Sequence, residues 1–155
     1  MLDIIVPVDH VGHGIYISGY RATQYTSELR AAKITHVLKL YADIPYFPND
    51  FVVFDNPIED GEPIPPQKMR DGVQFVANAL EADKQVLIMC AMGISRSSTF
   101  VLASLLRFQY TLEEAYRLLK SQHSVANPHP ALWHSLITHY SLPYRVEQAM
   151  EWTRE

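Results

Sequence analysis

One stretch of the sequence, residues 86–99, gathers the side chains best suited to chemistry. A short apolar run leads into Cys90, the single cysteine of the chain, and Arg96 follows six positions later. A cysteine thiolate is a strong nucleophile, and an arginine guanidinium grips two oxygens of an anion through its planar fork. The pair therefore predicts nucleophilic attack by Cys90 on an oxyanion that Arg96 holds, and a phosphate monoester fits that description.

The residues between this cysteine and this arginine predict a loop that surrounds the anion. Gly93 permits the backbone dihedral angles that turn amide groups inward. A helix that begins near Ser95 or Arg96 would direct unpaired N–H groups and the positive end of its dipole at the same point. This environment favours the thiolate of Cys90, and Ser97 is placed to donate a hydrogen bond to the sulfur. The predicted phosphate-binding residues are Ala91, Met92, Gly93, Ile94, Ser95 and Arg96.

A simpler interpretation of the cysteine competes with this one. A lone cysteine at the end of a buried strand usually serves as a small apolar core residue. An arginine six positions later occurs by chance about once in twenty, on the order of arginine usage in ordinary proteins. The spacing alone is therefore weak evidence, and the catalytic interpretation depends on Gly93, Ser95 and Ser97 in a strand–loop–helix context.

The elements that must position this loop alternate between strand and helix along the chain. Short apolar segments predict strands, and apolar residues at helical spacing predict helices, mostly in the second half. Thr111 and Glu114 form a capping-box pattern at the start of one of them. The alternation predicts an α/β fold, a mostly parallel, twisted sheet of about five strands flanked by helices. The predicted strands are 2–8, 14–18, 34–40, 51–54 and 85–89, and the predicted helices are 21–32, 66–82, 97–108, 111–121, 130–140 and 146–152.

Composition limits the class of protein. A chain of 155 residues suits one domain, residues 1–155. No apolar run approaches the ~20 residues that a membrane-spanning helix needs, and the acidic N-terminus is unlike a signal peptide. One cysteine suits a reducing compartment, so we expect a cytoplasmic protein. The net charge of −4 argues against nucleic acid or an anionic membrane as the main partner, and a monomer is expected.

The sequence from Cys90 to Ser97, CAMGISRS, resembles the signature loop of the dual-specificity branch of the protein tyrosine phosphatase superfamily. The resemblance extends over residues 13–140 in the correct order. Residues 14–22 and 34–40 are similar to the family's two early strands, 57–61 to its general-acid loop, and 128–136 to the segment before its late helix. The resemblance implies a tyrosine-phosphatase-like fold.

The resemblance also implies a mechanism. Cys90 would attack phosphorus and form a phosphocysteine intermediate, while Asp60, 30 positions upstream, would protonate the leaving oxygen. Glu59 and Glu62 flank Asp60 and are the alternatives for that role. No metal or cofactor is implied, and the implied substrates are phosphorylated protein side chains: phosphotyrosine, with phosphoserine and phosphothreonine as further candidates.

Two residues depart from the family pattern. Met89 stands where a histidine usually precedes the cysteine, and His129 stands where the family more often has asparagine. Met89 leaves open a pseudophosphatase that binds phosphate without efficient turnover. A second alternative is a phosphatase for phosphoinositides, inositol phosphates or RNA ends. Such relatives tend to carry basic residues inside the loop, whereas residues 91–95 are uncharged here, which favours phosphoproteins.

Other polar residues predict less. His129, His134 and His139 recur at spacings of five, which does not align them on one helical face, so no metal site is expected. His10 and His13, with Asp9, fall in a predicted loop and form a weaker constellation still. Tyr20 and Arg21 follow the second predicted strand and are candidates for the rim of the substrate site.

Overall fold

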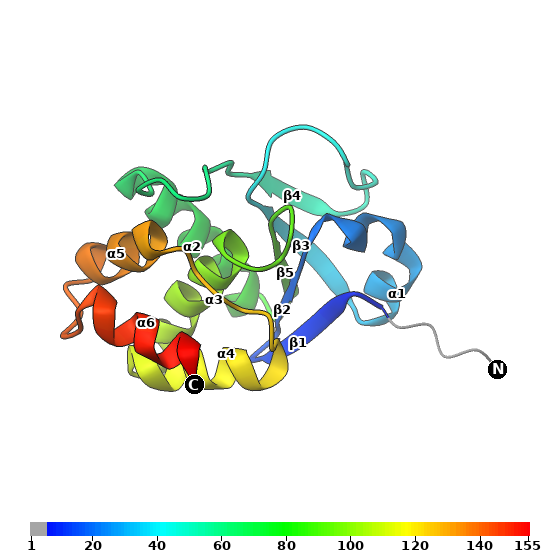
Figure 1. Ribbon diagram of the computed structural model, residues 1–155. Helices are drawn as coiled ribbons and strands as arrows, with labels where there is room; N and C mark the ends of the chain where they lie inside the picture. The colour runs from blue at the N-terminus through cyan, green and yellow to red at the C-terminus, as the bar shows by residue number, and fades with distance from the viewer. Residues whose placement is uncertain (1–5) are drawn as a thin grey trace.

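The computed structural model describes residues 6–155, and its centre is a five-stranded sheet (Figure 1). The strand order is β1-β2-β5-β3-β4, in which β1 runs antiparallel to β2 and every other neighbouring pair is parallel. The predicted α/β fold with a mostly parallel sheet is confirmed. The strands are β1 (Val8–Gly12), β2 (Ile15–Ser18), β3 (Ile34–Lys39), β4 (Val52–Asp55) and β5 (Gln85–Met89).

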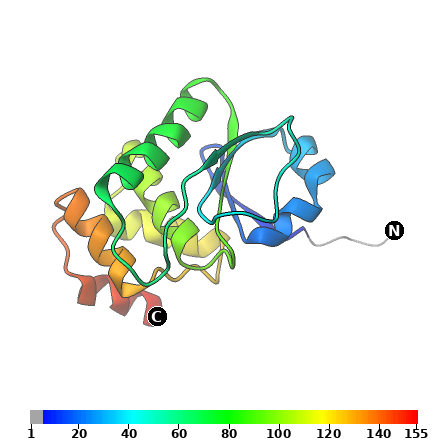
Figure 2. The same cartoon turned by 90° about the horizontal axis from the view of Figure 1, so that it is seen from above.

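Helices cover both faces of this sheet. Figure 2 shows α1, with the short helix that precedes it, on one face, while the longer helices gather on the other. The α-helices are α1 (Thr26–Ala31), α2 (Pro66–Glu81), α3 (Arg96–Leu105), α4 (Leu112–Gln122), α5 (Pro130–His139) and α6 (Val146–Arg154), and two 3-10 helices are η1 (Tyr20–Gln24) and η2 (Leu106–Phe108).

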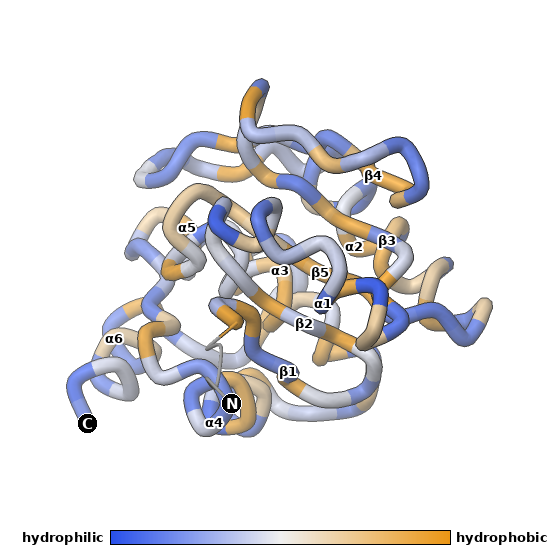
Figure 3. Tube along the Cα trace, turned by 90° about the vertical axis from the view of Figure 1, so that its right-hand side faces the viewer, coloured by the Kyte–Doolittle hydropathy of each residue, from blue (hydrophilic) through white to orange (hydrophobic). Residues whose placement is uncertain are grey.

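The central strand β5 is buried on both faces because its side chains alternate between two apolar cores. Leu87 and Met89 pack into the smaller core beneath α1, whereas Val86 and Ile88 pack into the larger core beneath α2 and α3. Figure 3 views the sheet from the α1 side, with apolar stretches along its strands. A strand in this position delivers the residue that follows it, Cys90, to a fixed point at the sheet edge.

Local sequence signals define the helix starts. Thr111 Oγ1 accepts a hydrogen bond of 3.1 Å from the Glu114 amide, and Glu114 Oε1 accepts one of 2.8 Å from the Thr111 amide. The predicted capping box of α4 is therefore confirmed. Pro66 stands in the first turn of α2, where its missing N–H costs no helical hydrogen bond.

Two predicted elements differ from the structure. The strand predicted over 2–8 lies partly outside the described residues, and the first described strand instead begins at Val8. Asp9 and His10 therefore belong to a strand and not to a loop, because the tight turn with positive φ at His13 and Gly14 pairs β1 with β2.

The helix predicted over 21–32 is interrupted. Tyr25, with φ of −123° and ψ of 37°, separates η1 from α1. The apolar spacing continues across this residue, so the sequence pattern shows no break there. Within residues 6–155, no helix combines the length and the apolar character needed to cross a membrane.

Candidate active site

Cys90 lies at the carboxyl end of β5, between β2 and β3. Its amide donates a hydrogen bond of 3.3 Å to the Ser18 carbonyl, and the Met89 carbonyl accepts one of 2.9 Å from the Leu40 amide. The side chain is only 2% exposed. The carboxyl edge of a parallel sheet is where α/β proteins commonly build their ligand sites, so the predicted nucleophile stands at a suitable point of the fold.

Two groups contact the sulfur. The Gly93 amide donates a hydrogen bond to Cys90 Sγ at 3.2 Å, and the hydroxyl of Ser97 lies 3.2 Å from the same atom. Ser97 belongs to the first turn of α3, which begins at Arg96. The structure thus brings Ser97 to the sulfur, as the sequence predicts.

The loop from Ala91 to Ser95 packs closely on the turn after β2. Gly93 has a φ of +72°, and a Cβ atom there would lie 2.6 Å from the Gly19 nitrogen. A Cβ atom on Gly19 would lie 2.9 Å from the Ala91 carbonyl oxygen, which accepts a hydrogen bond of 2.9 Å from the Tyr20 amide. Only glycine fits at these two positions without displacing backbone.

The predicted general acid is joined to this loop. Asp60 Oδ1 accepts a hydrogen bond of 2.7 Å from the hydroxyl of Ser95, and that hydroxyl accepts one of 2.8 Å from the His129 amide. Asp60, Glu59 and Glu62 are all exposed, and what distinguishes Asp60 is its hydrogen bond to Ser95 of the loop. Of the three acids in this segment, Asp60 is therefore the one that the fold directs at the loop.

Arg96 connects the two loops through the backbone. Its Nη1 donates a hydrogen bond of 3.1 Å to the Ile58 carbonyl, two residues before Asp60. A guanidinium carries five N–H donors in a fixed plane, so this contact orients the group and leaves further donors for an oxyanion. His129 caps α5, since its Nδ1 accepts a hydrogen bond of 3.0 Å from the Ala131 amide.

Met89 lies on the opposite face of β5 from Cys90. Its fully buried side chain packs in the apolar core beneath α1, with Ala22 and Leu87. A thioether donates no hydrogen bond, so this position gives the loop apolar packing and no polar support.

A buried cation lies on the same face. Lys39 pairs with Met89 in the β3–β5 register, and its Nζ lies 4.7 Å and 4.8 Å from the ring centroids of Tyr41 and Tyr46. The Asp55 carboxylate is 3.4 Å from this nitrogen, which also donates to the Asp43 carbonyl. Burial, with smaller contributions from the charges of Asp55 and Cys90, raises the pKa of Tyr41 to about 12.

Sequence reasoning missed the contact that His123 makes with the loop. His123 Nδ1 lies 2.6 Å from the Asp9 carboxylate, and Nε2 lies 2.5 Å from the Gly93 carbonyl oxygen. These partners are 114 and 30 positions away in the chain. No local pattern signals such an arrangement, which depends on β1 and α4 packing beside the loop.

Two hollows flank the loop. One, of about 450 Å³, is lined by the predicted rim residues Tyr20 and Arg21 together with Met92. The other, of about 320 Å³, is lined by Asp60 and His129. Met92 is 70% exposed and adds apolar surface to the first hollow, which the ionisable residues Asp9 and His123 also line.

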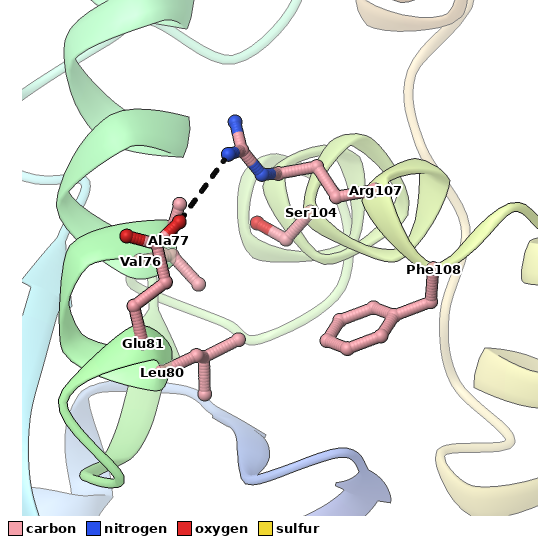
Figure 4. A pocket seen from close by; sticks show the side chains of 7 residues that line it. All are labelled: Val76, Ala77, Leu80, Glu81, Ser104, Arg107 and Phe108. Carbon is pink, nitrogen blue, oxygen red and sulfur yellow. Dashed lines mark ion pairs between the residues drawn. The ribbon is translucent and has the colours of Figure 1, made fainter.

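A third hollow lies away from this site. It measures about 280 Å³ and lies between α2 and the end of α3, where Arg107 and Glu81 face each other at 3.7 Å (Figure 4). The hydroxyl of Ser104, which lines it, donates to the Phe100 carbonyl of its own helix, and the lining residues come from the C-terminal parts of their helices. Among residues 6–155, no group of three or more His, Cys, Asp or Glu side chains is arranged to hold a metal ion.

Solved structures share this arrangement. A mouse putative dual specificity phosphatase complexed with zinc tungstate superposes with a TM-score of 0.84 at 22% identity, over 94% of this chain and 98% of that chain. Human DUSP28 superposes with a TM-score of 0.80 at 22% identity, over 96% and 97%. At these identities the likeness establishes the fold.

Sequence relatives extend the comparison. Dual specificity protein phosphatase 1 of Arabidopsis thaliana is 31% identical over 121 residues, covering 76% of this chain and 61% of the relative. Dual specificity protein phosphatase MPK-4 of Drosophila melanogaster is 29% identical over 133 residues, covering 79% and 33%. The chain thus spans less than two thirds of the length of these relatives. The family model of the dual specificity phosphatase catalytic domain matches residues 15–141, which include the cysteine loop and the acid loop, and the chain therefore belongs to that family.

Proposed function

We propose that the chain hydrolyses phosphate monoesters on phosphoproteins through a phosphocysteine intermediate. The observation that carries the proposal is the set of contacts around one point. The Cys90 sulfur receives the Gly93 amide and lies 3.2 Å from the Ser97 hydroxyl, and Asp60 is joined to the same loop through Ser95. Phosphotyrosine is the first candidate substrate, and phosphoserine and phosphothreonine are the next.

In the first step, the Cys90 thiolate attacks phosphorus, an S–P bond forms and the P–O bond to the leaving group breaks. Arg96 and the loop amides hold the charge on the equatorial oxygens. Asp60, protonated at the start, gives its proton to the departing oxygen. The leaving phenol or alcohol is thus released neutral.

In the second step, water attacks phosphorus and the S–P bond breaks. Asp60, now ionised, accepts a proton from the water as it attacks. The Ser97 hydroxyl donates a hydrogen bond to the sulfur, which leaves as thiolate. Inorganic phosphate is released, and both Cys90 and Asp60 return to their starting states.

The surface around the loop supports a protein side chain as substrate. Residues 91–95 carry no charge, and Met92 and Tyr20 present apolar surface beside the phosphate position. A phosphoinositide or another polyanion would require additional cations inside the loop.

A phosphate-binding module without efficient catalysis is the second candidate, and Met89 favours it. The residue before the nucleophile supplies no hydrogen bond, so the thiolate is supported by Gly93 and Ser97 alone among the contacts described above. This alternative predicts anion binding without turnover.

Hydrolysis of p-nitrophenyl phosphate without added metal tests the proposal. We expect turnover by the wild type, none by Cys90→Ser, and a phosphocysteine adduct in the acid-quenched wild type by mass spectrometry. Asp60→Ala should lose more activity on phosphotyrosine than on this aryl ester, whose leaving group hardly needs a proton. Glu62→Ala is the matched control. Tungstate binding with no turnover at any pH would favour the binding module instead.

A further inference from the structure

The ring of His123 lies between two acceptors at the edge of the phosphate loop. The residue caps the C-terminus of α4 and is 7% exposed. Its Nδ1 lies 2.6 Å from Asp9 Oδ2 on β1, and its Nε2 lies 2.5 Å from the Gly93 carbonyl oxygen. The ring therefore joins the edge strand of the sheet to the loop that contains Cys90.

These contacts define the charge of the ring. A peptide carbonyl and an ionised carboxylate accept hydrogen bonds and donate none, while a neutral imidazole has one N–H group. A neutral ring would leave a nitrogen lone pair facing an oxygen at one of these short distances. Only the imidazolium donates to both. Asp9 and His123 line one hollow, whose other ionisable residues are Tyr20 and Arg21. Within the loop, the Cys90 sulfur accepts a hydrogen bond from the Gly93 amide.

The contact to the Gly93 carbonyl also orients the next amide. The peptide joining Gly93 to Ile94 is trans, so its C=O and N–H point in opposite directions. A donor that holds the carbonyl from outside the loop turns the Ile94 N–H toward the inside. The following peptide is held in the same way, because the Ile94 carbonyl accepts hydrogen bonds from the Asn127 amide at 2.9 Å and from the Ser98 hydroxyl at 2.7 Å.

We propose that His123, as an imidazolium anchored by Asp9, is a positioning residue that directs the Ile94 amide at the substrate phosphate. This inference rests on the proposed function of the same loop. When His123 loses its proton with rising pH, the contact to the Gly93 carbonyl or the contact to Asp9 is lost. The Ile94 amide is then no longer fixed, and affinity for the anion falls.

Tungstate binding measured by calorimetry in a Cys90→Ser background tests this, since that background removes the titration of the thiol. Histidine commonly changes charge between about pH 5 and about pH 8, and tungstate is a dianion in neutral and alkaline solution, so the measurement covers the range from about pH 6.5 to about pH 8. We expect tungstate affinity to fall about tenfold across it. Adding His123→Arg, which keeps a cation with N–H donors for both acceptors, should reduce the fall to within about twofold. His134→Arg places the same charge at an exposed position on α5 and should leave the fall unchanged.

A second variant keeps the test informative if arginine does not fit. Asp9→Asn removes the carboxylate that stabilises the imidazolium, so the fall in affinity should move to lower pH. Long-range proton–nitrogen NMR spectra of the His123 ring report its protonation directly. A neutral ring throughout the range, or the same fall in Cys90→Ser with and without His123→Arg, would overturn the proposal.

These outcomes are separable from those of the proposed function. A pH-dependent affinity that His123→Arg flattens supports the positioning role even if the wild type hydrolyses nothing. Turnover by the wild type, with tungstate affinity independent of pH, removes the positioning role and leaves the phosphatase proposal intact.

Discussion

The carboxylate of Asp60 accepts a hydrogen bond of 2.7 Å from the hydroxyl of Ser95, although 35 positions separate the two residues. The same hydroxyl accepts a hydrogen bond from the His129 amide, and Arg96 donates to the Ile58 carbonyl of the acid loop. The acid loop is therefore attached to the phosphate loop at two points, one through a side chain and one through the backbone. If Asp60 is the general acid, we expect it to need little rearrangement when a substrate binds.

Ser95→Ala should lower turnover by weakening the placement of Asp60. We expect kcat for phosphotyrosine peptides to fall about tenfold, in line with the loss of part of a general-acid contribution, while KM changes little. The dependence of kcat on the pKa of the leaving group should become steeper, as in Asp60→Asn. A uniform loss across leaving groups would show that Ser95 acts on the loop and not through the acid.

Ser97→Ala should slow the second chemical step more than the first. The hydroxyl lies 3.2 Å from Cys90 Sγ, and in the proposed mechanism it stabilises the thiolate as the sulfur departs from phosphorus. We expect kcat to fall about tenfold to a hundredfold, with a burst of nitrophenol and accumulated phosphocysteine. Ser104→Ala is the control, because the Ser104 hydroxyl bonds the Phe100 carbonyl of its own helix and contacts neither the sulfur nor the loop. Loss of the burst itself would place the defect in the first step.

Gly93→Ala should destabilise the fold as well as remove anion binding. Its Cβ atom would meet the Gly19 backbone at 2.6 Å, at a φ of +72°. We expect a loss of about 2–4 kcal/mol in the free energy of unfolding, measured in urea. Gly12→Ala combines a positive φ with open space, since nothing lies within 4 Å of the added atom. That control should cost about 1 kcal/mol and leave tungstate affinity unchanged. Equal losses of unfolding free energy in Gly93→Ala and Gly12→Ala would argue against a steric contact between the added Cβ atom and the Gly19 backbone.

Tyr41 should make the fold sensitive to alkaline pH. Burial raises the pKa of Tyr41 in the folded chain to about 12 from a reference of 10.0. Below the pKa of Tyr41 in the unfolded chain, its neutral form contributes fully to the stability of the fold. As pH rises, the unfolded chain releases this proton first, so the contribution is lost by the time pH passes the pKa in the folded chain. Unfolding free energies in urea between about pH 10 and about pH 12 should therefore fall less steeply in Tyr41→Phe. The exposed Tyr46→Phe should not change that slope.

The parts of the site that are contiguous in the chain were the predictable ones. Cys90, Gly93 and Arg96 lie within one strand–loop–helix segment, so their spacing carries the geometry of the loop. The role of Asp60 could be predicted only through the family resemblance, because an aspartate in a turn has no local sequence signature. The catalytic roles of these residues stay predictions until the kinetic tests above are made.

The parts that depend on tertiary packing could not be predicted. His123 follows a helix in an ordinary polar segment, and only the docking of β1 beside α4 gives it Asp9 as a partner. The position of β1 was predicted wrongly for a related reason, since Asp9 and His10 interrupt the apolar pattern that marks the other strands. Lys39 lies in a segment that was predicted as an apolar strand, and nothing nearby in the sequence indicates that the ring of Tyr46 lies over its ammonium group.

Strand β1 pairs with a neighbour on one side only, yet it carries the carboxylate that anchors His123. Edge strands open more readily than central ones, so their amide hydrogens exchange with solvent at lower free energies than those of the core. Each such opening would withdraw Asp9 from the ring while β5 remains in place. The affinity of the loop for an anion would then depend on the local opening equilibrium of β1, and not on the global free energy of unfolding.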